Sequence, residues 1–335
     1  MSYGNDQGFT SDEHGHDWAL VLAGGEGSRL HELTRIASGI SVPKQFCSLG
    51  AGASLLHSAL QRAHGVAPPA RTCVIVADHH RRWWQPLSLG LPAQNVIVQP
   101  CGRGTATGIL LPLLQILRRD PGASLLILPS DHYVRKESVL ASSLKRAMLH
   151  VRQNHDRILL LGFEPEAADP ELGYIVAADK AAPGIGTVSR FVEKPSAAAA
   201  RALIESGGLW NSFIFAARGE TLLRAFEARC AETISEMRHI LERPANGSLR
   251  QMRLVDLYQR LPEIDFSRDI LQQSTARLEV LKVPSCGWSD LGTPLRVAEA
   301  VRRDRSIGRG APMATPHARG FLDLAAQHLQ LQAVR

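Results

Sequence analysis

The sequence lacks the features that mark several common classes of protein. Nine Phe, five Trp and four Tyr make up only 5% of its 335 residues, too few and too scattered for a platform that stacks nucleic-acid bases. Lys and Arg give a net charge of +6 but form no basic stripe, so no nucleic-acid partner is expected. No apolar run approaches the ~20 residues that a membrane-spanning helix needs, and no membrane partner is expected either.

Cysteine is also scarce. The five cysteines have neither metal-binding nor redox spacing, and five cannot all pair within one chain; they are Cys47, Cys73, Cys101, Cys230 and Cys286. Reduced thiols in the cytoplasm are therefore expected. The N-terminal segment MSYGNDQGFTSDEHGHD has no apolar stretch of the kind found in signal peptides. Its histidines, His14 and His16, are expected to be solvated in a disordered tail rather than metal ligands.

The remaining composition is that of a soluble globular protein, with 44% apolar and 21% charged residues. A length of 335 residues allows one large domain or two ordinary ones. The scattered positive charge suits small anionic substrates.

Short apolar runs alternate with longer periodic segments from Trp18 onward. WALVLA, TCVIVA, NVIVQ, SLLILPSDH and RILLLGFE are typical of buried strands, and SLLHSALQRAHGV, TATGILLPLLQILRRD and SVLASSLKRAMLHVRQN of helices. Thr105 is placed to cap the second of these helices. The alternation predicts an α/β fold with a parallel sheet covered by helices on both faces. In such sheets ligands bind beyond the carboxyl ends of the strands, where LAGGEGSR, QPCGRGTA and PSDH fall.

The second half of the chain has a mixed pattern. TVSRFVEK, WNSFIFAAR and RLEVLKV are predicted strands, and SAAAARALIES, ETLLRAFEARCAETISEMRHILE, LRQMRLVDLYQRL and TPLRVAEAVRRD are predicted helices. No repeat or low-complexity linker divides the chain. We therefore expect one large domain whose second half forms a mixed α+β substrate lobe.

The loop LAGGEGSRL, residues 22–30, follows the first predicted strand and has the glycine content of a phosphate-binding loop. It is not the dinucleotide fingerprint, because Leu30 stands where the third glycine is required. It is not the loop of nucleotide hydrolases either, because Gly27 is followed by Ser28 and Arg29 instead of Lys and Ser or Thr. An ordinary strand-to-helix turn remains an alternative for this stretch alone.

Seven short motifs occur in order and give the chain a family resemblance. They are LAGGEGSRL, PKQF (43–46), QPCGRGTATG (99–108), PSDH (129–132), FVEKP (191–195), WNSFIF (210–215) and WSDLGT (288–293). Over about residues 18–298 the chain resembles the sugar-1-phosphate nucleotidyltransferases, and most closely the bacterial mannose-1-phosphate guanylyltransferases. The resemblance implies a Rossmann-like, mostly parallel sheet and a catalytic domain at 17–300. Within it, the nucleotide half would span about 17–165 and the sugar-binding half about 166–300. Outside the resemblance we expect a disordered polar tail at 1–16 and a C-terminal helical extension at 301–335.

The resemblance also implies roles for residues on the nucleotide side. Arg29 and Lys44 would be catalytic and hold the α-phosphate, where in-line attack concentrates negative charge on the phosphoryl oxygens. The other nucleotide-binding residues are expected to be Leu22, Ala23, Gly24, Gly25, Gly27, Ser28, Gln99, Gly104 and Thr105.

Asp131 in PSDH and Asp290 in WSDL match the family's metal ligands, and Mg²⁺ prefers such carboxylate oxygens. The alternative for both is a capping or turn role. His132 is expected either to pack beside Asp131 or to support the metal ligands from outside the site, rather than to be a ligand itself. The sugar phosphate would be bound by Gly173, Glu193, Lys194 and Asn211. After Ser212 the family usually has glycine, and this chain has Phe213. Asp265, in EIDFSRDIL, is given no role and is allowed a structural one.

These inferences predict the transfer of a nucleotidyl group from a nucleoside triphosphate to a sugar 1-phosphate. The specific expectation is that GTP and α-D-mannose 1-phosphate give GDP-mannose and diphosphate, with Mg²⁺ as cofactor. The alternatives are another base (UTP, dTTP or ATP) or sugar, or a relative that senses nucleotide-sugar without catalysis. A Rossmann oxidoreductase is disfavoured by the missing third glycine. The sequence leaves open a homodimer.

Overall fold

The computed structural model describes residues 15–27, 30, 33–35, 39–49, 52–178, 184–244 and 247–303. Two residues of the expected site, Ser28 and Arg29, lie outside the described residues. His14 and most of the predicted segments 1–16 and 301–335 also lie outside them. His16 is described, and its Nδ1 lies 2.7 Å from Asp120 Oδ1. His16 therefore contacts the folded domain instead of being purely solvated.

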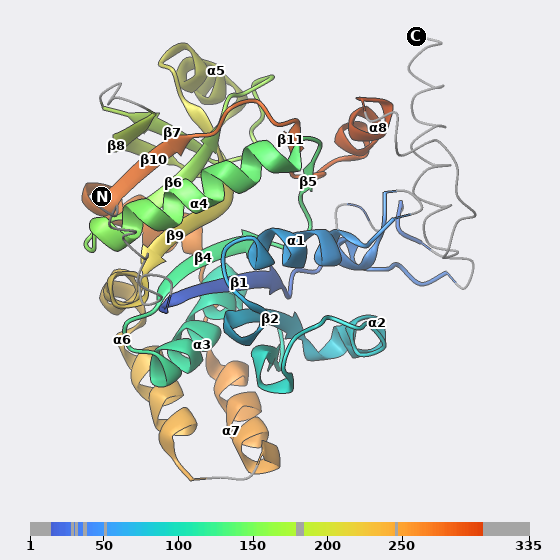
Figure 1. The fold of residues 1–335 in the computed structure, drawn as a ribbon, viewed down its shortest axis with the longest axis vertical. Helices are drawn as coiled ribbons and strands as arrows, with labels where there is room; N and C mark the ends of the chain where they lie inside the picture. The colour runs from blue at the N-terminus through green and yellow to red at the C-terminus, as the bar shows by residue number, and fades with distance from the viewer. Residues whose placement is uncertain are drawn as a thin grey trace, which may run out of the picture.

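In the described part of the chain, nine strands form one central sheet (Figure 1). In spatial order they are β3 (Val96–Gln99), β2 (Thr72–Ala77), β1 (Asp17–Ala23), β4 (Ser124–Pro129), β9 (Leu209–Arg218), β6 (Ile158–Phe163), β10 (Leu278–Lys282), β8 (Ile185–Val192) and β7 (Tyr174–Ala177). β3, β2, β1 and β4 are mutually parallel, so their carboxyl ends share one edge. The predicted α/β fold is confirmed.

The second half of the chain changes the sheet's pairing. β9 inserts between β4 and β6 and is antiparallel to both, so the strand RILLLGFE does not lie beside SLLILP. β10 is parallel to β6, whereas β8 and β7 continue the sheet with antiparallel pairing. β4, β6 and β9 are all mostly apolar along their length, so their sequence patterns do not distinguish a central strand from its neighbours. Local pattern alone therefore did not determine the order of the strands.

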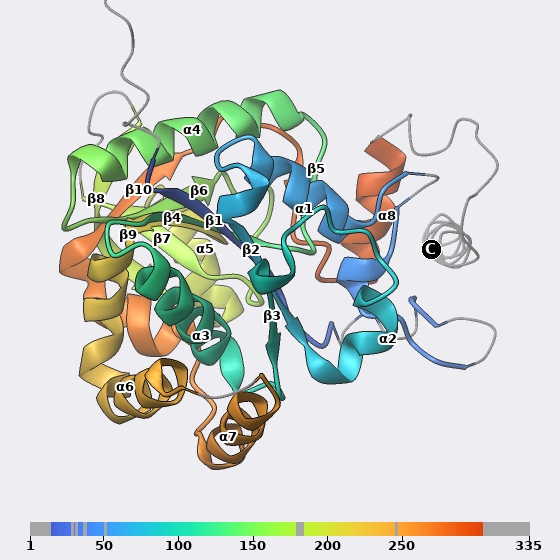
Figure 2. The same cartoon turned by 60° about the horizontal axis from the view of Figure 1, so that its bottom comes forward.

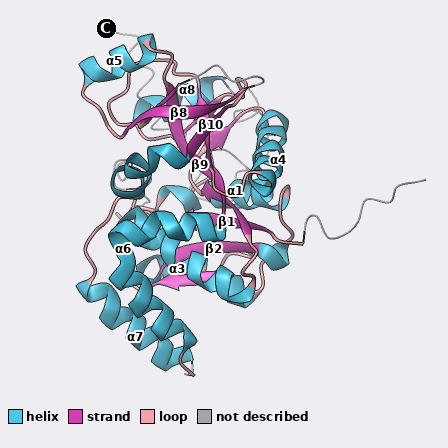
Figure 3. Ribbon diagram, turned by 90° about the vertical axis from the view of Figure 1, so that its left-hand side faces the viewer, coloured by secondary structure: helices cyan, strands magenta, loops and turns pink. Residues whose placement is uncertain are grey.

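Helices cover both faces of the sheet, as Figures 2 and 3 show. The longer helices are α1 (Leu55–His64), α3 (Gly104–Arg119), α4 (Glu137–Gln153), α5 (Ala197–Glu205), α6 (Gly219–Glu242), α7 (Gly247–Arg260) and α8 (Pro294–Arg303), and a short α2 spans Arg81–Trp84. α3 and α6 pack on one face and α1 and α4 on the other, while α5 lies at the end of the sheet that carries β8 (Figure 3). Alternate residues of β1 serve the two cores: Leu20 belongs to the first and Val21 to the second.

A third apolar cluster joins two segments that are far apart in the sequence, residues 30–55 and residues 291–300. Val297 and Ala298 of α8 pack with Leu30, Val42 and Leu55, all fully or nearly buried. This packing positions α8 beside the segment that carries the PKQF motif.

The remaining short elements include a 3-10 turn η2 (Lys44–Phe46), a turn η4 (Asp78–His80) and a π-helical turn η6 (Phe266–Leu271) that leads into η7 (Gln272–Arg277). All five cysteines lie in the described part of the chain, and none is bonded to another. Among the described residues, no helix has both the length and the apolar character to span a membrane.

Candidate active site

The motifs meet where the parallel strands end. The loop 24–27 follows β1, η4 follows β2, residues 100–103 follow β3, and Ser130 and Asp131 follow β4. Because β3, β2, β1 and β4 are parallel neighbours, these four loops share one edge of the sheet. The backbone N–H of Ser130 donates to Leu22 O at 3.1 Å, which holds two of these strand ends together.

Lys44, in η2, contacts residues at this edge of the sheet. Lys44 is 5% exposed, and its Nζ lies 2.9 Å from Asp131 Oδ2. The same ammonium donates to the backbone oxygen of Asp290 at 2.6 Å. A buried ammonium requires such partners, because leaving its charge uncompensated would cost several kcal/mol. Lys44 thus joins the two predicted metal ligands, which are far apart in the chain.

A small two-stranded sheet brings these aspartates together. β5 (Tyr133–Val134) pairs antiparallel with β11 (Trp288–Ser289), with Tyr133 opposite Ser289. Trp288 Nε1 also donates to His132 Nδ1 at 3.2 Å, and the two rings pack edge to face. Burial lowers the pKa of His132 to about 3, so its ring is neutral. The structure thus places His132 in packing, as expected.

Asp131 keeps an accessible carboxylate. Its side chain is 33% exposed. Partial burial opposes ionisation, but the charge and hydrogen bond of Lys44 outweigh it and hold the pKa of Asp131 below its ordinary value. Asp131 is therefore an anion near neutral pH, and its carboxylate, which is about one-third exposed, is the kind of ligand that hard cations bind.

Asp290 has a more enclosed carboxylate. Its Oδ1 accepts from the backbone N–H of Gly292 at 3.0 Å and forms an ion pair with Arg296 on α8. Arg296 also pairs with Asp169, and its guanidinium lies 5.6 Å from the centre of the Trp210 ring. Any cation held by Asp290 must therefore share this carboxylate with Arg296.

A cavity of about 360 Å³ lies beside the loop 24–27, and most of the expected nucleotide-binding residues line it. Its lining includes Leu22, Gly24, Gly25, Gln99, Gly104 and Thr105. Gln45 fixes the loop above it, since its Nε2 donates to Ala23 O at 3.0 Å and to Gly25 O at 2.9 Å. A Cβ on Gly27 would lie 3.3 Å from the backbone nitrogen of Lys44. The cavity and the Lys44 site are therefore adjacent.

Gln99 is the notable polar group in this cavity. Its Oε1 is buried and has no hydrogen-bond partner among the described residues. A buried acceptor without a partner is unfavourable by about 1–3 kcal/mol, so Gln99 Oε1 is available to accept a hydrogen bond. The expectation that Thr105 caps α3 is wrong. The N-cap is Arg103, and the Thr105 hydroxyl instead accepts from the backbone N–H of Phe266 at 2.7 Å.

Three of the expected sugar-phosphate residues contact one another on the other half of the sheet. The backbone N–H of Asn211 donates to Gly173 O at 2.8 Å. A Cβ on Gly173 would lie 2.5 Å from Glu193 Oε2, so glycine makes room for this carboxylate. Glu193 Oε2 is buried without a partner in the described part of the structure. Lys194 follows it, exposed and with a φ of 48°.

Phe213 shows why glycine suits the fourth position of WNSF. Its φ is 58°, in the left-handed region that a side chain enters at a cost of roughly 1–2 kcal/mol. The ring packs edge to face against Phe215 and Phe266, which offsets that cost.

Asp265 has the structural role allowed for it: its Oδ1 accepts from the backbone N–H of Arg268 at the start of η6.

Glu193 should make stability depend on pH. Burial and the nearby Asp265 raise its pKa from 4.5 to about 7. Between these two pH values the folded state keeps a proton on Glu193 that the unfolded state has lost. The stabilisation that this proton gives the folded state is therefore complete below pH ~4.5 and is lost as the pH rises through ~7. Glu193→Gln is expected to raise the thermal midpoint at pH 8 by roughly 2–4 °C and to leave it nearly unchanged at pH 5. An equal shift at both pH values would contradict this account.

Sequence reasoning missed two residues of this site. Gln45 stands inside the PKQF motif, so its motif position could have indicated its contact with the glycine loop. Arg296 gave no such signal. Its partners, Asp169 and Asp290, are distant from each other in sequence and meet only through the packing of α8.

Comparisons with known proteins agree with this arrangement. Residues 18–306 match the family model described as nucleotidyl transferase. The chain is 31% identical over 293 residues to mannose-1-phosphate guanylyltransferase 2 of Escherichia coli O157:H7, covering 82% of this chain and 58% of that protein. It is 29% identical to alginate biosynthesis protein AlgA of Pseudomonas syringae, covering 82% of this chain and 56% of AlgA. The chain thus spans a little over half the length of these relatives.

Solved structures show the same fold. The crystal structure of mannose-1-phosphate geranyltransferase from Thermus thermophilus superposes with a TM-score of 0.72 at 28% identity, covering 86% of this chain and 80% of that one. Nucleotidyl transferases generally use a divalent metal ion. The matched region contains the glycine loop, Lys44 and both aspartates. On this evidence the chain belongs to the nucleotidyl transferase family.

Proposed function

We propose that this protein transfers the guanylyl group of GTP to α-D-mannose 1-phosphate, giving GDP-mannose and diphosphate. The observation that carries the proposal is the junction at Lys44, whose ammonium contacts both Asp131 and the backbone of Asp290 beside the nucleotide cavity. Relatives named as mannose-1-phosphate guanylyltransferases support the choice of substrates.

The chemistry requires positive charge where the two reactants meet. An oxygen of the sugar phosphate attacks the α-phosphorus of the triphosphate, and diphosphate leaves from the opposite side. Lys44 stabilises the charge that builds on the phosphoryl oxygens, and we assign Arg29 the same role from its motif. Because both the nucleophile and the electrophile come from substrates, no covalent intermediate with the protein is needed. Catalysis then rests on positioning and charge.

Asp131 and Asp290 are the residues we expect to hold Mg²⁺. They fit because Mg²⁺ binds through one or two carboxylates and takes its other ligands from phosphates and water. When bound, the ion would neutralise and align the phosphates of both substrates. Asp131 offers the accessible carboxylate, while Arg296 keeps Asp290 oriented through its ion pair.

Recognition of the two substrates would use the two unpartnered acceptors. Gln99 Oε1 can accept a hydrogen bond from an N–H on the edge of a purine, and guanine presents two such donors side by side. Glu193 Oε2 can accept from a sugar hydroxyl, with Asn211 beside it and Lys194 assigned to the sugar's phosphate.

A substrate matrix tests the proposal. GTP, ATP, UTP, CTP and dTTP would each be paired with mannose 1-phosphate and glucose 1-phosphate in the presence of Mg²⁺, and released diphosphate measured. We expect the highest kcat/KM for GTP with mannose 1-phosphate. Turnover only with UTP or dTTP and glucose 1-phosphate would refute the substrate assignment. Binding of GDP-mannose without turnover of any pair would identify the chain as a sensor instead.

Gly24 and Gly247 provide a matched pair of variants. A Cβ on Gly24 would lie 2.4 Å from Gln99 Nε2, whereas a Cβ on Gly247, which does not line the cavity, would meet nothing within 4 Å. In Gly24→Ala the Gln99 amide must therefore leave its present position. We expect the Kd for GTP, measured by calorimetry, to rise at least about tenfold in Gly24→Ala and less than about threefold in Gly247→Ala. Equal effects of the two substitutions would contradict the assignment of Gln99 to the base.

A further inference from the structure

A second group of metal-binding side chains lies at the same edge of the sheet but away from Lys44. Glu26 belongs to the glycine loop after β1, and His79 and His80 belong to η4 after the neighbouring strand β2. One ligand atom from each of the three side chains lies within 4.8 Å of the others. No motif of the sequence analysis included these two histidines, and the proposed transfer reaction does not use them.

The contacts converge on the carboxylate of Glu26. His79 Nε2 lies 2.7 Å from Glu26 Oε1, and His80 Nε2 lies 3.5 Å from Glu26 Oε2. The two imidazole rings are 4.0 Å apart between centres. Both Nε2 atoms therefore lie next to the same carboxylate. Two nitrogen ligands and one oxygen ligand for a metal ion are thus close together.

The protein alone satisfies His80 poorly. The residue is 5% exposed, its Nε2 contact to Glu26 is longer than an ordinary hydrogen bond, and its Nδ1 has no partner among the described residues. The edge of Phe46 packs against the ring from the side of η2. A simple ion pair would explain His79 but not why a second, buried imidazole faces the same carboxylate.

We propose that Glu26, His79 and His80 form a binding site for a first-row transition-metal ion, with Zn²⁺ as the best fit. Two imidazoles and one carboxylate are a common ligand set for Zn²⁺, and they leave a fourth position for water. Imidazole donors disfavour Mg²⁺, which distinguishes this site from the one at Asp131. Tetrahedral ligands stand about 3.4 Å apart, so small rotations of the half-exposed Glu26 and His79 complete the geometry.

The location suggests what the ion does. Glu26 lines the 360 Å³ cavity, where its negative charge opposes an anionic ligand. A bound ion neutralises that carboxylate and ties the glycine loop to η4. This consequence rests on the proposed function, whereas the site itself does not.

The test is calorimetric titration of the full chain with ZnCl₂, without nucleotide or sugar phosphate, so that its outcome is independent of the proposed reaction. We expect one ion per chain with a micromolar or tighter Kd, little competition from millimolar Mg²⁺, and the visible absorption of a tetrahedral site when Co²⁺ replaces Zn²⁺. Because His80 is buried, the informative variants are His79→Ala and Glu26→Gln, whose side chains are about half exposed. Each is expected to weaken Zn²⁺ binding at least about tenfold.

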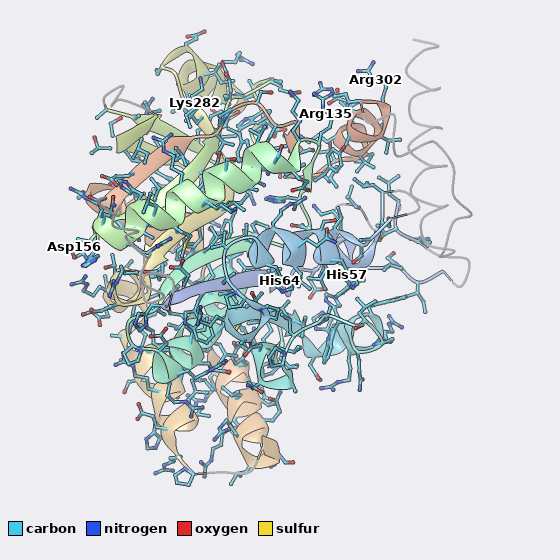
Figure 4. All side chains as sticks on the ribbon, viewed as in Figure 1. His57, His64, Arg135, Asp156, Lys282 and Arg302 are labelled. Atoms are coloured by element: carbon cyan, nitrogen blue, oxygen red, sulfur yellow. The ribbon has the colours of Figure 1, made fainter. Side chains whose placement is uncertain are left out.

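The chain has 13 histidines, so background binding needs a matched control. His64, exposed at the end of α1 and labelled in Figure 4, serves as that control, and His64→Ala should bind Zn²⁺ within twofold of the unmodified protein. The proposal is overturned if the unmodified chain takes up no Zn²⁺ at 100 μM. It is equally overturned if His79→Ala and Glu26→Gln bind as the parent does, or if His64→Ala loses as much affinity as they do.

Discussion

Asp131→Asn is expected to lower kcat for GDP-mannose formation by roughly 10³-fold while the protein stays folded. The substitution removes the negative charge that we assign to the metal, and metal-assisted charge stabilisation is worth several kcal/mol, at about 1.4 kcal/mol for each tenfold in rate. Asn keeps an oxygen near Lys44 Nζ, which lies 2.9 Å from the present carboxylate, so the ammonium retains an acceptor. Steady-state diphosphate release measures the change.

Asp156→Asn is the matched control. Asp156 is exposed and pairs with Arg224. It follows the C-terminal end of α4, whereas Arg135 precedes the N-terminal end of this helix, as Figure 4 shows. We expect its kcat to stay within twofold of the parent value, and both variants to melt within a few degrees of the parent. Full activity of Asp131→Asn would remove Asp131 from the metal site.

Lys44→Met is expected to lower kcat by at least about 10²-fold, because a single preorganised donor at a developing negative charge contributes that much. Met fills the same slot without charge. The substitution also leaves Asp131 without its cation and the Asp290 carbonyl without its donor. The pKa of Asp131, which Lys44 holds down, should then rise, and the acidic limb of the pH–rate profile should move to higher pH.

Lys282→Met controls for the loss of a lysine. Lys282 is half exposed on β10 and pairs with Glu164, away from the glycine loop (Figure 4). Its kcat should be unchanged. Lys44→Arg should not restore activity, since the planar guanidinium is a poor replacement for a compact ammonium in a buried slot. If Lys44→Met kept the parent kcat and pH profile, Lys44 would have only a structural role.

Local pattern was enough to predict the elements that hold most of the site. In α1, the five residues expected on one face, Leu55, Leu56, Ala59, Leu60 and Ala63, are all buried. β1 and β4 were recognised from their apolar runs, and parallel pairing then placed Gly24 and Asp131 at one edge. These features depend on residues close in sequence, where hydrophobic periodicity is informative.

Long-range contacts were not predictable in the same way. The pairing of β5 with β11 joins two-residue strands about 150 residues apart, too short for any periodic signal. The ion pair between Arg296 and Asp169, which are 127 residues apart, depends on how α8 packs against Leu30 and Val42. The Glu26 cluster arises only because β1 and β2 are neighbours, and its histidines stand in a turn without a recognisable motif. In each case tertiary packing decides which side chains meet.

The most direct test of the central claim follows the α-phosphorus. The protein would be incubated with Mg²⁺, mannose 1-phosphate and GTP labelled at the α-position, and the products separated. Attack by the sugar phosphate at the Lys44 and Asp131 site predicts that the label appears in GDP-mannose and that unlabelled diphosphate forms in equal amount. Label that stays in GTP, or that appears in GMP through attack by water, would contradict the account.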